Sequence, residues 1–180
     1  EIIKLQADMS SLAARVNLAP LAKFRIFLYN ISAAILFQLV VILLVLAYIM
    51  LVLKIDFGGK TGYILLTCFL GSVTGIFFGT LVSVGFKNTG IKHAITIGGT
   101  MLSCFLAGMM VVDMKYIIQQ HAPLVAYLNP ANLITDAFYS LYYYEGLTRY
   151  WHSVILLCAY AAVMCLATCL VMRRKKYASL

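Results

Sequence analysis

Four long runs without any charged residue constrain this chain more than any other feature of its sequence. They cover residues 26–53, 61–86, 94–112 and 153–172. A helix crosses a hydrocarbon core about 30 Å thick with about 20 apolar residues, and each run has roughly that length. We therefore expect an all-α integral membrane protein with four transmembrane helices.

The composition excludes an ordinary soluble domain. Hydrophobic residues make up 63% of the chain and charged residues 11%, whereas soluble domains average about 45–50% and about 25%. The chain opens at Glu1 without a signal-peptide pattern. We expect residues 1–180 to form a single transmembrane unit, the C-terminal part of something longer.

The basic residues between the runs predict an orientation. Ten of the fourteen Lys and Arg residues flank the runs on one side, and by the positive-inside rule that side is cytoplasmic. Both ends of the chain, including the tail 173–180, are then cytoplasmic, and residues 54–60 and 113–150 face outward. The cytoplasmic set is Lys4, Arg15, Lys23, Arg25, Lys87, Lys92, Arg173, Arg174, Lys175 and Lys176.

The high net charge of +8 invites comparison with nucleic-acid-binding proteins. The basic residues, however, are spread over the ends of the spans and form no groove interleaved with aromatic residues. Topology and contact with anionic membrane lipid account for them better. We expect no nucleic-acid partner, and we expect the protein in the cell membrane.

Residues 1–22 differ from the spans because apolar and polar positions alternate there at helical spacing. This pattern predicts an amphipathic cytoplasmic helix that lies on the membrane or docks on a partner. Pro20 interrupts the chain just before the first span.

Residues 113–150 hold the most informative polar pattern. Asn129-Pro130 is a helix-start signature, with Asn as the N-cap and Pro in the first turn. Pro123 interrupts the segment earlier, and the tyrosines at 142–144 favour a membrane–water boundary. We expect two short outer interfacial helices, a helical hairpin that either merely connects two spans or gates an exit path.

The sequence contains no clear catalytic, metal or nucleotide site. No Asp, Glu, Lys, Arg or His lies inside the four runs, which disfavours ion-coupled carriers and intramembrane hydrolases. The Gly58-Gly59-Lys60-Thr61 stretch resembles the end of a P-loop, but Lys54 occupies the position of the first glycine. A simple turn is the better interpretation. We expect this chain to bind no cofactor and no metal.

Three glycines in the second run, Gly71, Gly75 and Gly79, are spaced by four residues. Small residues at this spacing line one helix face and allow another backbone to approach closely. The partner helix could belong to the same chain or to another subunit.

Three stretches together resemble the ATP-binding-cassette type-2 permeases, which share the fold of the ABCG-like exporters. The stretches are LAPLAKFRIFLYN at 18–30, LVSVGFKN at 81–88 and AYLNPANLITDAFYSL at 126–141. The resemblance covers nearly the whole chain. One departure is Val111-Val112-Asp113, where the family often has a Phe-Pro pair, and this leaves the shape of the outer gate open.

The resemblance implies a permease subunit of an exporter with six spans, of which this chain holds the third to the sixth. It implies a partner ATP-binding-cassette ATPase that holds ATP and Mg, and a second permease half, identical or different. By the same resemblance the coupling residues are Leu18, Pro20, Leu21, Lys23 and Arg25; the outer gate is Asn129, Pro130 and Asp136; and the path is lined by Thr100, Ser103, Phe105 and Met109.

Two other functions stay open at this stage. An ATP-independent channel or carrier needs no ATPase partner, and a membrane scaffold would tolerate changes at Pro20 and Leu21 without losing transport. The apolar lining is compatible with lipids, amphipathic peptides, drugs or glycolipids, so no single substrate is indicated.

Overall fold

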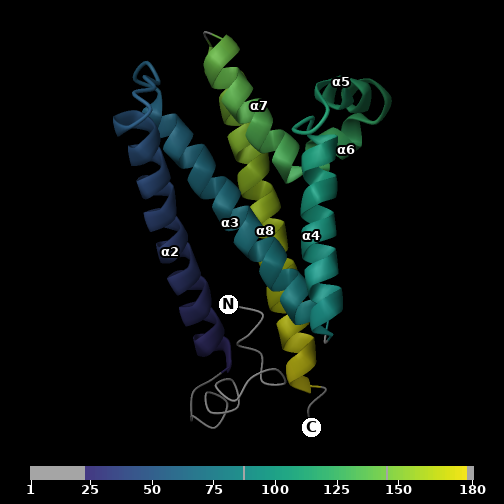
Figure 1. The fold of residues 1–180 in the computed structure, drawn as a ribbon. Coiled ribbons are helices and arrows are strands. Elements are labelled where there is room, and N and C mark those ends of the chain that lie inside the picture. Colours follow the sequence, from purple (N-terminus) through teal and green to yellow (C-terminus); the bar gives the residue numbers. More distant parts are fainter. Residues whose placement is uncertain (1–22, 87, 145, 178–180) are drawn as a thin grey trace.

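The fold is all-helical, as expected, over the residues that the computed structural model describes, which are 23–86, 88–144 and 146–177 (Figure 1). Three of these helices, α2, α3 and α8, are long and apolar enough to cross a membrane. The helices are α2 (Lys23–Leu51), α3 (Thr61–Gly85), α4 (Thr89–Leu106), α5 (Val112–His121), α6 (Pro123–Leu128), α7 (Pro130–Tyr143) and α8 (Thr148–Tyr177).

The helices are arranged around the pair α3 and α8, which make the most extensive helix–helix contact. α7 packs on both of them, α4 packs on α3 and α7, and α2 packs on α3. We call the end of the molecule that holds α5 to α7 and the turn at 52–60 the upper end (Figure 1). The turn between α3 and α4 and the start of α2 lie at the opposite, lower end.

The run at 94–112 differs from the expected span. α4 begins at Thr89, where the Asn88 side chain caps it by accepting from Gly90 N at 2.9 Å, and it ends at Leu106. Gly108 then adopts a left-handed φ of +78° and turns the chain, so 107–111 does not continue the helix. α4 also includes Lys92 and His93, which lower its apolar character, and it is not among the three candidate spans.

The segment 113–150 forms three helices instead of the expected two. Prolines begin both α6 and α7. Proline is favourable there because the first N–H groups of a helix have no partner within the helix, so the N–H that proline lacks is not missed. The last span also begins earlier than expected, since α8 starts at Thr148 and not at Ser153.

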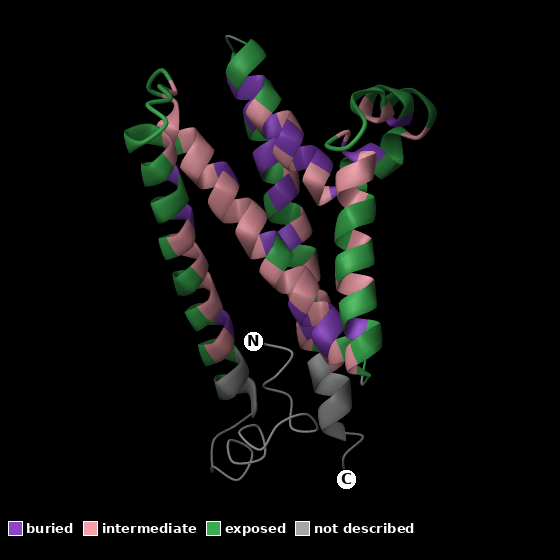
Figure 2. Ribbon diagram, in the orientation of Figure 1, coloured by how far each residue is buried: buried purple, intermediate pink, exposed green. Residues whose placement is uncertain are grey.

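The best-packed part of the molecule lies where α3, α7 and α8 meet, near the upper end (Figure 2). Ala137 and Leu141 of α7 pack with Tyr150 and Val154 of α8. The Tyr150 side chain is fully buried, and its hydroxyl donates to the Tyr63 carbonyl of α3 at 2.9 Å. This junction fixes the upper end, on which the candidate site is built.

Candidate functional site

Asn129 holds the start of α7 in place. Its Oδ1 accepts a hydrogen bond from Ala131 N at 3.1 Å, so it is the N-cap, and Pro130 follows in the first turn; both were predicted. Its Nδ2 donates to the Ser103 carbonyl of α4 at 2.8 Å. One buried side chain therefore caps α7 and ties it to the last turn of α4.

Asn132, which was not predicted as a site residue, adds a second tie. Its Nδ2 donates to the Ala126 carbonyl of α6 at 3.0 Å, and the side chain is buried. A buried amide needs such a partner, because leaving it unsatisfied costs about 1–3 kcal/mol. The signal in the sequence was a second Asn within one turn of the cap, but its partner could not be read from spacing.

Asp136 lies between two basic side chains from different helices. Its Oδ1 is 2.6 Å from Lys115 Nζ of α5 and 3.9 Å from Arg149 Nη2 of α8. Lys115 also lies over the Tyr139 ring at 4.6 Å from the centroid, and Arg149 Nη1 donates to the Tyr144 hydroxyl at 3.0 Å. The carboxylate thus joins α5, α7 and α8 at one point, although neither basic partner was predicted.

A cavity of about 620 Å³ adjoins this carboxylate. Side chains from four helices, α5 to α8, surround it, and those from α8 belong to its first two turns. The lining residues are Gln119, Pro123, Ala126, Tyr127, Asn132, Leu133, Asp136, Thr148, Arg149, His152 and Ser153. Asp136 is the only predicted gate residue in this set, and none of the four predicted path residues belongs to it.

The turn between α2 and α3 is connected to the same region. Gly58 and Gly59 have left-handed φ values of 57° and 75°, which glycine adopts readily, so the predicted turn is confirmed. Lys60 Nζ donates to the Leu141 carbonyl at 2.6 Å, near the C-terminus of α7. A cation there also complements the helix dipole.

The predicted path residues lie along α4 and just beyond its end. Thr100 is exposed, and its hydroxyl donates to the Thr96 carbonyl at 2.7 Å. Ser103 accepts from Asn129 through its carbonyl, Phe105 is half-buried, and Met109 is exposed after the helix has ended.

The three glycines of α3 have different surroundings. A Cβ built on Gly71 would lie 2.9 Å from Ile134 Cδ1 of α7, so this glycine allows a close approach within the chain. A Cβ on Gly75 or Gly79 would meet no atom within 4 Å.

Most of the predicted coupling residues lie outside the described part of the chain. These are Leu18, Pro20 and Leu21. Lys23 is the first residue of α2, and Arg25 is exposed in its first turn.

One charged residue is buried just before the run expected at 94–112. Lys92, in the first turn of α4, is fully buried at the lower end. The sequence placed it in a loop because α4 was expected to start at residue 94. Among the described residues, no group of His, Cys, Asp and Glu could hold a metal ion.

Comparison with known proteins identifies a family that matches this chain. The family described as "ABC-2 family transporter protein" matches residues 7–170, which is most of the chain. No curated protein and no solved structure matches.

Proposed function

The chain belongs to the ABC-2 family of transporter proteins, and on this basis we propose that it is the permease of an ATP-driven transporter that exports a hydrophobic or amphipathic substrate. The family match over residues 7–170 is the observation that carries the proposal. The energy then comes from an ATP-binding-cassette ATPase, which holds ATP and Mg and is either a separate chain or another domain.

The proposed assembly contains two permease halves in the cell membrane, and in each half α4 also crosses the membrane, as the fifth of six spans. Lys23 and Arg25 at the start of α2 and Lys92 at the start of α4 lie near the lower end, and the distribution of Lys and Arg along the sequence supports a cytoplasmic position for that end. The upper end, with the cavity and the buried asparagines, is then on the outside.

α7 is well placed to act as a gate because its ties reach three neighbouring helices. Asn129 joins it to α4, Asp136 joins it to α5 and α8, and Lys60 joins its far end to the turn before α3. A displacement of α4 or α8 relative to α3 would therefore pull on α7. We propose that ATP binding to the ATPase is transmitted to the permease through residues 10–25, produces this displacement and opens the upper end.

The test uses the full protein with its ATPase, purified by tag from gently solubilised membranes and reconstituted in liposomes. We expect ATP hydrolysis and ATP-dependent movement of a fluorescent amphiphile across the bilayer. The double variant Leu21→Asp, Lys23→Asp should abolish the ATP-dependent movement of the amphiphile. It should also abolish the stimulation of ATP hydrolysis by the amphiphile. Lys54→Gln, which removes an exposed charge in the turn at 52–60, serves as the control and should change neither.

The alternatives give different results in the same experiment. Movement that proceeds without ATP would replace the proposal by a channel or carrier. A clean preparation with no ATPase and no movement would leave a scaffold as the function.

A further inference from the structure

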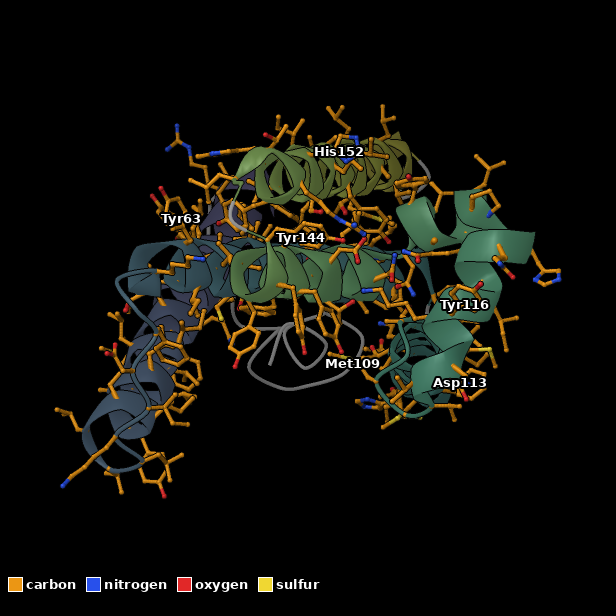
Figure 3. The ribbon with its side chains drawn as sticks, turned by 90° about the horizontal axis from the view of Figure 1, so that it is seen from above. Tyr63, Met109, Asp113, Tyr116, Tyr144 and His152 are labelled. Carbon is orange, nitrogen blue, oxygen red and sulfur yellow. The ribbon has the colours of Figure 1, made fainter. Side chains whose placement is uncertain are left out.

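The cavity at the upper end has one polar side rich in hydrogen-bond donors. Arg149 and His152 project from the first turns of α8, and Thr148 opens that helix beside them. Seen from the upper end, His152 lies on α8, whereas Asp113 and Tyr116 mark α5 on the other side of the cavity region (Figure 3). The partial positive charge of the α8 N-terminus adds to the charge of Arg149.

Two charged residues of opposite sign, Arg149 and Asp136, line the cavity. Asp136 is engaged by Lys115 at 2.6 Å, so its charge is already matched. Arg149 stands 3.9 Å from the carboxylate, outside hydrogen-bond range, and its one hydrogen bond to a described residue goes to Tyr144. A guanidinium carries several N–H donors in a planar fork. Lys115, which lies outside the lining, makes the close contact with Asp136, and the Arg149 guanidinium lies over the Tyr144 ring at 5.1 Å from the centroid. Arg149 therefore has N–H donors at the cavity that are not used by any described residue.

An apolar wall formed by Pro123, Ala126 and Leu133 of α6 and α7 also lines the cavity, next to the polar side chains of Gln119, Asn132 and Asp136. Tyr127 contributes a ring whose centroid is 6.4 Å from that of His152. A volume of about 620 Å³ holds a polar headgroup together with the first part of an alkyl chain. The arrangement therefore fits an amphiphile with an anionic head better than an uncharged apolar molecule.

We propose that this cavity binds the phosphate-bearing headgroup of an amphiphile, with Arg149 as its principal ligand and His152 and Thr148 as further donors. The planar guanidinium fork matches two phosphate oxygens at once, which makes arginine suited to phosphate. The apolar wall receives the start of the lipid chain. This proposal deepens the proposed function by specifying the polar end of the exported substrate.

The experiment measures binding without ATP, so its outcome is independent of whether transport is ATP-driven. The full protein in an uncharged detergent is titrated with short-chain phosphatidic acid, with the corresponding diacylglycerol and with glycerol 3-phosphate, and heat is recorded. We expect saturable binding of phosphatidic acid, about tenfold or more weaker binding of diacylglycerol, and a similar loss for phosphatidic acid with Arg149→Gln.

Two variants keep the result interpretable. Lys54→Gln removes a positive charge near the same end but away from the cavity, and it should bind as the unaltered protein does. Arg149→Lys keeps the charge but loses the planar guanidinium fork, and it should bind with intermediate affinity even if Arg149→Gln folds poorly.

Glycerol 3-phosphate binding as tightly as phosphatidic acid would keep the anion site and assign it to soluble phosphates. Equal binding of diacylglycerol and phosphatidic acid, or unchanged binding by both Arg149 variants, would overturn the proposal.

Discussion

The helices α2 and α7 show opposite relations between hydrophobicity and burial. α2 has 29 residues, nearly all apolar, yet most of its large side chains are exposed. α7 has 14 residues and carries Asn, Thr, Asp and Ser, yet six of its residues are buried, three of them polar. In a soluble protein the more apolar helix would be expected in the interior.

The bilayer explains this inversion. Lipid tails solvate apolar side chains as well as a protein core does, so α2 gains little by burial. Buried polar groups, in contrast, have few water partners and must be satisfied inside the protein. Asn132, Thr135 and Ser140 of α7 each donate to a backbone carbonyl, and all three are buried.

The contact that α2 does make follows a narrow face. Its buried residues are Ile31, Ile42 and Leu46, which fall on one side of an α-helix. Among the described helices this face meets α3, while the remaining surface is exposed.

The largest effect should come from Tyr150→Ala at the junction of α3, α7 and α8. The substitution removes a fully buried ring and its hydrogen bonds to Tyr63 and Thr67. We expect the free energy of unfolding to fall by about 3–5 kcal/mol, as for other buried aromatic truncations. Unfolding in mixed micelles by titration with a denaturing detergent measures this change.

The matched substitution in α2 is Phe37→Ala, at a ring that is 71% exposed. It should leave the free energy of unfolding nearly unchanged. A loss as large as that of Tyr150→Ala would show that α2 is covered in the full protein, and the contrast between the two helices would then fail.

A smaller effect is expected from Gly71→Leu, where α3 approaches α7. The new side chain must displace Ile134, whose Cδ1 lies 2.9 Å from the Cβ position. Overpacking of this kind typically costs about 1–3 kcal/mol. Gly75→Leu, on the same helix with no atom within 4 Å, should cause no loss in the same unfolding titration. Equal losses in both variants would contradict the assigned α3–α7 contact.

The smallest effect should follow from Asn129→Ala, which removes the cap of α7 and its tie to Ser103. We expect a loss of about 1–2 kcal/mol, as for other N-caps. Asn129→Ser keeps an oxygen for the cap but is too short to reach α4, so its loss in stability should be intermediate.

Asn30→Ala in α2 supplies the comparison for Asn129, because Asn30 is only half-buried. It should change stability little. If Asn129→Ala were equally harmless, the buried amide would not stabilise the α4–α7 contact.

The candidate site could be predicted only in part. Asn129 and Pro130 were identified because an N-cap followed by proline is a local pattern. Asp136 was identified as well, but its partners Lys115 and Arg149 lie on other helices, and no spacing rule connects them. The hydrogen bond from Lys60 to the Leu141 carbonyl joins residues 81 positions apart, and no local sequence pattern predicts it.

The sequence by itself determined the membrane class, the approximate lengths of α2 and α3, the turn at Gly58-Gly59 and the start of α7. These depend on apolar length, on glycine at left-handed φ and on cap chemistry, all of which act over a few residues. The tertiary structure alone decided which helices pack together, where α4 ends and how deeply Lys92 and α7 are buried. A uniformly apolar helix carries no stripe that points to its neighbour, so its partners follow from polar ties and close fits that only the folded chain contains.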